Sequence, residues 1–216
     1  MSRLLSLDEG TTLIQYARKV IESSFRGKQL EDLPERLPDT LLEPRGVFVT
    51  LKKRGSIKRT EWDLRGCIGH LQPSPSSHQQ PLSLIEATRR AALSSAFDDP
   101  RFPPVHENEF NSILIEISVL TQPEEIVIED RTKLSQHVII GRDGLIVHGK
   151  GWHRGLLLPQ VAPEQDWNAE EFLQGCCQKA GLPSSCFLDL DVKIFKFQAQ
   201  IFAETAPNGE IIERKF

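Results

Sequence analysis

Cys67 lies between two glycines, in a segment whose residue types suit nucleophilic or anion-binding chemistry. The segment is Leu64-Arg-Gly-Cys-Ile-Gly69. Glycine lets a strand bend and lets another group approach the backbone, so Gly66 and Gly69 could direct the Cys67 thiol into a cleft. A cationic neighbour such as Arg65 lowers the pKa of a thiol, and the thiolate is the nucleophile. The segment is therefore the predicted functional centre, with Cys67 as the candidate catalytic nucleophile.

The same segment has a structural explanation that remains open. Cysteine is among the most frequently buried residue types, and Gly-Cys-Ile-Gly also suits a tightly packed strand crossing. On a straight strand Arg65 shares the face of Cys67, whereas His70, a potential base, does not. The residue types alone do not decide between chemistry and packing.

Arg101 and Phe102 lie in a loop that prolines stiffen on both sides, within Asp98-Asp-Pro-Arg-Phe-Pro-Pro104. The planar guanidinium of a rigid arginine can bind both oxygens of a carboxylate or phosphate. Alternatively, Arg101 holds the loop by pairing with a nearby carboxylate, for which the candidates are Asp98, Asp99 and Glu116.

Gln160 follows Pro159 and could orient a ligand amide or carbonyl, although fixing the loop is the favoured interpretation. His148 and His153 lack further ligands at a recognised spacing, so no metal site is predicted. The phosphate-loop and nucleophile-elbow patterns are absent, and we expect no cofactor.

The composition indicates a globular chain that can bury a sizeable core. Of 216 residues, 39% are hydrophobic and 26% are charged, which fits one large domain or one domain with a subordinate lobe. The net charge of −4 disfavours binding to nucleic acid or to an anionic membrane. We expect the basic cluster to be a solvated hairpin tip; it comprises Lys52, Lys53, Arg54, Lys58 and Arg59.

The cellular compartment is predicted from the termini and the cysteines. No apolar run approaches the ~18–20 residues that span a bilayer, and the N-terminal residues do not form a secretory signal. No CxxC motif occurs. We interpret all four cysteines as reduced thiols of a cytoplasmic protein; they are Cys67, Cys176, Cys177 and Cys186.

Hydrophobic periodicity and capping residues predict the elements of the first half of the chain. Ser6 and Glu9 fit a capping box at the start of a helix. In chain order we expect a helix over 7–25, a connecting loop over 28–45, paired strands over 47–52 and 64–71, a flexible insertion over 73–80, and a helix over 81–97.

The second half predicts further strands and one helix. Ile113 to Leu120 alternates most clearly. We also expect short strands or buried segments over 138–140, 145–147 and 155–158, with a hairpin turn at 142–144 between the first two. A helix from Asn168 to Ala180, a strand over 192–203 and edge pairing at 211–212 complete the prediction. The predicted fold class is α+β, a mainly antiparallel sheet flanked by helices.

Six segments, in this order and spacing, resemble the AMMECR-one family, named after a human chromosomal region linked to Alport syndrome and elliptocytosis. The similarity covers nearly the whole chain, and the cysteine motif is specific to the family. The segments are Gly46-Val-Phe-Val-Thr-Leu51, Leu64-Arg-Gly-Cys-Ile-Gly69, Asp98-Asp-Pro-Arg-Phe-Pro-Pro104, Glu116-Ile-Ser-Val-Leu-Thr121, Gly141-Arg-Asp-Gly-Leu-Ile146 and Gly155-Leu-Leu-Leu-Pro-Gln-Val161.

This resemblance implies a single domain over residues 1–216, with a larger lobe that holds both termini, a smaller internal lobe and a cleft between them that contains the cysteine motif. It points to the archaeal or bacterial branch. Relatives there occur beside a Memo-like protein or a radical-SAM enzyme, which makes such enzymes candidate partners. The stretch Pro73–Gln80 is longer than is typical of the family.

Three functions are carried forward. The first is an enzyme that uses Cys67 on a small anionic substrate. The second is a non-catalytic ligand-binding or adaptor module for a partner enzyme, and the third is an RNA-binding factor. The candidate substrate-binding residues are Arg65, Gly66, Gly69, Arg101, Phe102 and Gln160.

Overall fold

The structure is a computed structural model that describes residues 4–27, 33, 36–55, 62–72 and 80–214. The chain divides into two compact units. The first unit is formed by Met1–Val119 and Gln200–Lys215, and the second by Leu120–Ala199. The expected single domain with a larger outer lobe and a smaller internal lobe stays a prediction. The expected cleft between the lobes stays a prediction, and most of the predicted insertion over 73–80 lies outside the described residues.

The first unit is built on an antiparallel sheet. Strand β1 (Val47–Arg54) pairs on one side with β2 (Trp62–His70) and on the other with β3 (Ile113–Leu120). Strand β8 (Ile211–Arg214) pairs with the end of β7 (Lys193–Glu204). These pairings confirm the predicted strands, and they leave β2 at the edge of the sheet.

Two long helices belong to this unit, α1 (Leu7–Phe25) and α3 (Leu84–Phe97), and each begins at a capping box. The bounds of α1 are those predicted. Helix α3 starts later than the predicted Pro81, because the capping box is formed by Ser83 and Glu86. Two short helices also occur, α2 (Asp39–Leu42), within the segment expected to be a loop, and α4 (Glu107–Phe110).

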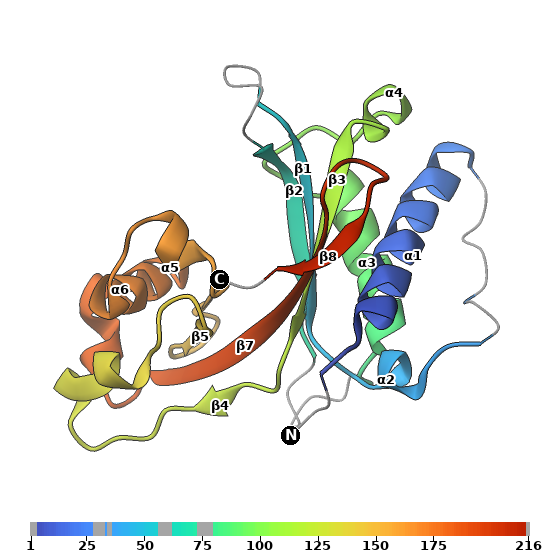
Figure 1. The fold of residues 1–216 in the computed structure, drawn as a ribbon. Helices are drawn as coiled ribbons and strands as arrows, with labels where there is room; N and C mark the ends of the chain where they lie inside the picture. The colour runs from blue at the N-terminus through green and yellow to red at the C-terminus, as the bar shows by residue number, and fades with distance from the viewer. Residues whose placement is uncertain (1–3, 28–32, 34–35, 56–61, 73–79, 215–216) are drawn as a thin grey trace. The chain divides into compact units, whose positions relative to one another are not determined.

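The helices and the sheet of the first unit enclose its core. Helices α1 and α3 lie together on one side of β1, β2 and β3 (Figure 1). Val49 and Leu51 of β1 and Ile115 of β3 are fully buried in the cluster that these helices share. Because side chains alternate along a strand, Thr50 and Glu116 project from the opposite face. That face, which we call the polar face, carries the groups described below.

The second unit contains its own sheet and core. Strand β5 (Asp143–His148) pairs with β6 (Arg154–Leu157) and with the first part of β7, which also pairs with β4 (Glu124–Glu125). The helical elements are η1 (Arg131–His137), α5 (Val161–Glu164), α6 (Ala169–Lys179) and η2 (Ser184–Leu188). In the part of the chain that the structure describes, none of the helices has both the length and the apolar character needed to cross a membrane.

Residues 138–140 do not form a strand, so the strand alternative for this segment and the hairpin predicted at 142–144 are wrong. The Asp143 carboxylate accepts a hydrogen bond from the Ile139 N–H at 2.9 Å, and the Asp143 N–H donates to the Ile139 carbonyl at 2.9 Å. These bonds turn the chain before β5 begins. The hairpin instead joins β5 to β6, with Gly149 donating to the His153 carbonyl at 2.9 Å.

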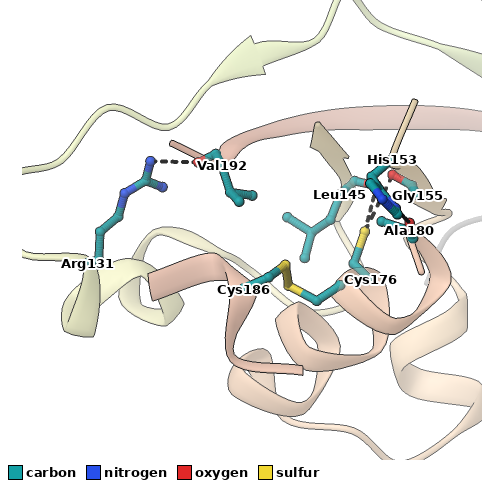
Figure 2. The surroundings of a disulfide bond; sticks show 9 residues. Arg131, Leu145, His153, Gly155, Cys176, Ala180, Cys186 and Val192 are labelled. Atoms are coloured by element: carbon teal, nitrogen blue, oxygen red, sulfur yellow. Dashed lines mark hydrogen bonds between the residues drawn. A yellow bond between two sulfur atoms is a disulfide. The ribbon is translucent and has the colours of Figure 1, made fainter. Parts of the chain in front are cut away.

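The interpretation of four reduced thiols is also wrong, because Cys177 and Cys186 form a disulfide that joins α6 to η2. The Leu182 N–H donates to the Cys177 carbonyl at 3.0 Å, so the chain folds back after α6 and brings the two cysteines to a Cα–Cα distance of 5.9 Å. Figure 2 shows Cys176 directed toward the carbonyl oxygens of Leu145 and Gly155, at 3.5 and 3.7 Å from its Sγ. Burial raises the pKa of this free thiol to about 12.

Candidate functional site

Cys67 belongs to a row of polar side chains that crosses three strands. It lies opposite Thr50 of β1, and Thr50 lies opposite Glu116 of β3. The Thr50 hydroxyl donates a hydrogen bond to the Cys67 Sγ at 3.3 Å. All three residues project from the polar face. We call them the polar row.

A β-bulge interrupts strand β2 beside Cys67, as the glycine pattern predicted. Leu51 lies opposite Gly66 and Lys52 lies opposite Leu64, so the intervening Arg65 has no counterpart on β1. The bulge takes Arg65 out of the regular alternation. Its guanidinium Nη2 donates to the Glu109 Oε1 at 2.7 Å, so Arg65 forms an ion pair with a carboxylate of α4.

Both glycines of the motif are required by close packing. A Cβ atom on Gly66 would lie 2.1 Å from the Ser95 carbonyl oxygen of α3. A Cβ atom on Gly69 would lie 2.3 Å from the Phe48 ring. Gly66 therefore allows the helix to approach the sheet, and Gly69 gives room to an aromatic ring on the polar face.

Ser95 ties α3 to the two strands. Its hydroxyl accepts from the Ile68 N–H at 2.8 Å and donates to the Val49 carbonyl at 2.6 Å. Val49 and Ile68 are register partners, so the fully buried hydroxyl bridges the ladder at this position. The buried polar groups are thereby satisfied, which fixes β2 next to Cys67.

The backbone of Cys67 is held by an ion pair, which we call the Asp99–Arg101 clamp. Asp99 Oδ2 accepts from the Cys67 N–H at 2.8 Å, and Arg101 Nη2 donates to the Cys67 carbonyl at 3.0 Å. Arg101 also binds both oxygens of Asp99, at 2.9 and 2.7 Å. This hydrogen bonding from Arg101 lowers the pKa of Asp99 to about 2.

Of the two explanations for Arg101, the clamp confirms pairing with Asp99. The arginine side chain nevertheless remains 49% exposed. Its guanidinium carbon lies 5.5 Å from the centre of the Phe102 ring, and that of Arg65 lies 6.0 Å from it. The structure thus brings Arg65, Arg101 and Phe102 together around the Cys67 segment. Substrate binding by these residues stays a prediction.

Gln160 belongs to the second unit. It is the N-cap residue of α5, and its side chain makes no capping hydrogen bond. Its Oε1 is buried without a hydrogen-bond partner among the described residues. The role of Gln160 toward a ligand stays a prediction.

The surroundings of the Cys67 thiol disfavour its ionised form. Burial raises its pKa, and the negative charges of Asp99 and Glu116 add to that effect. The Thr50 hydrogen bond and the charge of Arg101 oppose the shift without reversing it. His70 projects from the other face of β2, where burial and the charge of Arg90 lower its pKa. The surroundings therefore do not generate a thiolate.

The charged residues beside the polar row were not predicted from the sequence. Lys52 was expected at a solvated hairpin tip, but its ammonium lies 3.0 Å from the Glu116 Oε2, and Arg214 Nη1 lies 2.6 Å from the same oxygen. Lys58 and Arg59 of the predicted tip lie outside the described residues. The available signal was Glu116 itself, because a carboxylate within an otherwise apolar strand requires a buried partner. No cluster of His, Cys, Asp and Glu suited to a metal occurs within the described ranges.

Comparison with known proteins gives consistent matches over the whole chain. The family model described as AMMECR1 matches residues 14–202. A protein of Methanothermobacter thermautotrophicus is 49% identical over 200 residues, covering 93% of this chain and 96% of its own. Protein MJ0810 of Methanocaldococcus jannaschii is 46% identical over 213 residues, covering 99% and 98%.

A solved structure has the same fold. It is the crystal structure of the uncharacterized protein PH0010 from Pyrococcus horikoshii, which is 44% identical in sequence. The superposition covers 97% of this chain and 98% of that one, with a TM-score of 0.86. Fold and sequence similarity therefore extend over both units.

Proposed function

The chain belongs to the AMMECR1 family, as the sequence resemblance predicted, and we propose that it is a small-ligand-binding protein in which Cys67 does not act as a nucleophile. The polar face of the first unit supplies the binding surface. The ligand is a small anion, held without conversion. The observation that carries this proposal is the geometry at Cys67, whose N–H and carbonyl are both held by the Asp99–Arg101 clamp and whose thiol pKa is raised by burial.

A nucleophilic cysteine needs a lowered pKa or an adjacent base. Cys67 has the opposite shift, caused chiefly by burial. His70, the histidine nearest to Cys67 in the sequence, projects from the other face of the strand. These features favour binding over covalent catalysis.

The two arginines of the predicted site also serve the fold. Arg65 is 11% exposed and paired with Glu109, and Arg101 is paired with Asp99. An arginine that already binds both oxygens of a carboxylate has fewer donors for a substrate. These contacts therefore support a structural role for the clamp, which holds the backbone of Cys67 in place.

Iodoacetamide labelling across a pH series, followed by mass spectrometry, tests the proposal. We expect Cys67 of the folded protein to react more slowly at neutral pH than the same residue in urea, because the thiol is partly buried and its pKa is raised. Labelling should rise only at alkaline pH, above the usual range for a thiol. Cys176 serves as the internal control, since it is fully buried and should not label in the folded state.

Faster labelling of folded than of unfolded Cys67 at neutral pH would contradict the proposal. A Cys67→Ser variant provides a second measurement, because serine retains a polar group beside Thr50. Folding should be unchanged by circular dichroism, and binding of an anionic probe to the polar face should also be unchanged. Loss of that binding in a folded variant would assign the sulfur a direct role.

A further inference from the structure

The hairpin that joins β5 to β6 carries a large aromatic side chain that the second unit leaves uncovered. Trp152 is 99% exposed. Tryptophan is highly buried on average, because its indole is large and mostly apolar. A Cβ atom on the neighbouring Gly151 would meet no atom within 4 Å, so the tip of the hairpin projects into open space. The indole is therefore available to another molecule.

The turn before β7 contacts this hairpin and adds two exposed leucines. The Lys150 ammonium lies 2.6 Å from the Asp191 Oδ2, which joins the hairpin to the turn. Leu190 is 73% exposed and Leu188 is 44% exposed. We call Trp152, Leu188 and Leu190 the apolar patch. Exposed apolar side chains that gather on two adjoining segments mark an interaction site, unlike apolar residues scattered singly over a surface.

Both segments of the patch are held by the body of the second unit. The Gly149 N–H donates to the His153 carbonyl at 2.9 Å, and the His153 Nδ1 lies 3.1 Å from the Ala180 carbonyl oxygen at the end of α6 (Figure 2). The disulfide joins α6 to η2, whose last residue is Leu188. A partner therefore meets a surface that is already formed, which reduces the entropic cost of binding.

Most of the charges around the patch are neutralised within the second unit. Lys150 pairs with Asp191, and Lys193 of β7 pairs with Glu125 of β4 at 3.3 Å. Each pair combines one cation with one carboxylate. The paired residues therefore supply no excess of positive charge, which an acidic protein, a nucleic acid or an anionic membrane would require.

Arg154 and Asp189 are the remaining charged residues beside the patch. Both are exposed, and neither forms an ion pair with any residue that the structure describes. Lys150 is near enough to be influenced by the charge of Asp189, but its ion pair is with Asp191. Strand β5 lies between β6, which begins at Arg154, and β7, which follows Asp189. The two opposite charges thus lie on opposite sides of the patch.

We propose that this surface binds a second copy of the chain. Trp152 of each copy packs against the apolar patch of the other, and Arg154 pairs with Asp189 of the partner subunit. A two-fold axis through the patch produces this pairing twice, because both copies use the same self-complementary surface. The inference concerns the second unit and does not depend on the function proposed for the polar face.

Sedimentation equilibrium of the full chain over a concentration series tests the proposal. We expect an equilibrium between monomer and dimer. Trp152→Ser should weaken the dimer by about thirtyfold or more, because a central tryptophan dominates contacts of this kind. Leu42→Ser is the matched control, since Leu42 is 48% exposed but belongs to the first unit. Its dimer should be as stable as that of the unaltered protein.

An exchange of charges tests the predicted ion pairs. Arg154→Asp places two carboxylates opposite each other, and Asp189→Arg places two guanidinium groups opposite each other, so each variant alone should be monomeric. An equal mixture of the two variants should form a dimer again, because each supplies the charge that the other lacks. Circular dichroism should show both variants folded, since both positions are exposed.

Three results would overturn the inference. The first is an unaltered protein that remains monomeric up to about 1 mM. The second is a dimer that Trp152→Ser leaves as stable as before. The third is a mixture of the folded Arg154→Asp and Asp189→Arg variants that stays monomeric while the unaltered protein dimerises.

Discussion

In each unit a helix packs against the outermost strand of the sheet at a glycine. In the first unit a Cβ on Gly66 of β2 would lie 2.1 Å from the Ser95 carbonyl oxygen of α3. In the second unit a Cβ on Gly155 of β6 would lie 2.6 Å from the Cys176 carbonyl oxygen of α6. Both contacts bring helix backbone against strand backbone at a distance that only glycine permits.

The groups around the two contacts differ. Beside Gly66, the strand is held by the Ser95 hydroxyl and by the Asp99–Arg101 clamp. Beside Gly155, the helix contributes the buried Cys176, and the next residue, Cys177, forms the disulfide. One contact is surrounded by hydrogen bonds and an ion pair, whereas the other is surrounded by apolar packing and by a disulfide that joins its helix to η2.

The comparison shows that the first unit has more buried polar groups than helix packing requires. In the second unit the helix packs on an apolar core, and a disulfide joins it to η2. The first unit buries charges beside its edge strand, and buried charges stabilise a fold less than apolar residues of the same volume often do. Retention of such groups around Cys67 and Glu116 is the structural reason for placing the binding function on the polar face.

Gly66→Ala should give the largest loss of stability. The added methyl group meets the Ser95 carbonyl, a backbone atom of α3 that cannot rotate away, so we expect a loss of about 3 kcal/mol in the free energy of unfolding. Gly155→Ala should cost about 2 kcal/mol, because its nearest contacts are 2.6 Å rather than 2.1 Å. Urea unfolding followed by circular dichroism measures both.

Gly69→Ala is the control for these variants. Its methyl group would meet the ring of Phe48, a side chain that can rotate, so the cost should be about 1 kcal/mol. If Gly69→Ala destabilises the protein as much as Gly66→Ala does, the comparison between backbone and side-chain contacts is wrong.

The long elements were predictable because their signals are local. The capping box of Ser6 and Glu9 marked the start of α1, and the alternation from Ile113 to Leu120 marked β3. The family segments indicated the α+β fold, and the glycine pattern indicated a bulge in β2. In each case the residues that fix the element lie within the element itself.

The wrong predictions involve side-chain contacts that hydrophobic periodicity does not reveal. The apolar residues 138–140 resemble a strand, but the Asp143 side chain caps them. The Cys177–Cys186 disulfide depends on η2, which has no helical periodicity in the sequence. At the site, Lys52 could be placed in a strand, yet its pairing with Glu116 depends on the register of β1 against β3.

Loss of the disulfide should have the next largest effect. The cysteines are nine positions apart, and closing a loop of this length restricts the unfolded chain by about 2.5 kcal/mol. Cys177→Ala/Cys186→Ala should therefore unfold at lower urea concentration, and reductant should lower the stability of the unaltered protein by a similar amount.

Reductant should have no effect on the double variant, which has no disulfide to break. It should also leave the iodoacetamide labelling of Cys67 unchanged, because Cys67 is a free thiol in the first unit. If reduction alters the labelling of Cys67, the disulfide influences the surroundings of Cys67, and the two glycine contacts are not independent.

Low pH should weaken the hydrogen bonds that hold strand β2 beside Gly66, and it should leave the disulfide unchanged. Hydrogen bonding from Arg101 and Cys67 lowers the pKa of Asp99 from 3.8 to about 2 in the folded protein. The carboxylate is buried, so its ionised form contributes about 2 kcal/mol of stability, present in full above the unfolded pKa near 4 and lost as the pH falls toward 2.

Asp99→Asn should remove this contribution at pH 7 and flatten the dependence of the unfolding free energy on acid pH. Asp98→Asn, a change at the exposed neighbour, is the control and should leave both unchanged. A variant at Asp99 that keeps the full acid dependence would show that other carboxylates, such as Glu109, whose pKa is also about 2, govern acid stability.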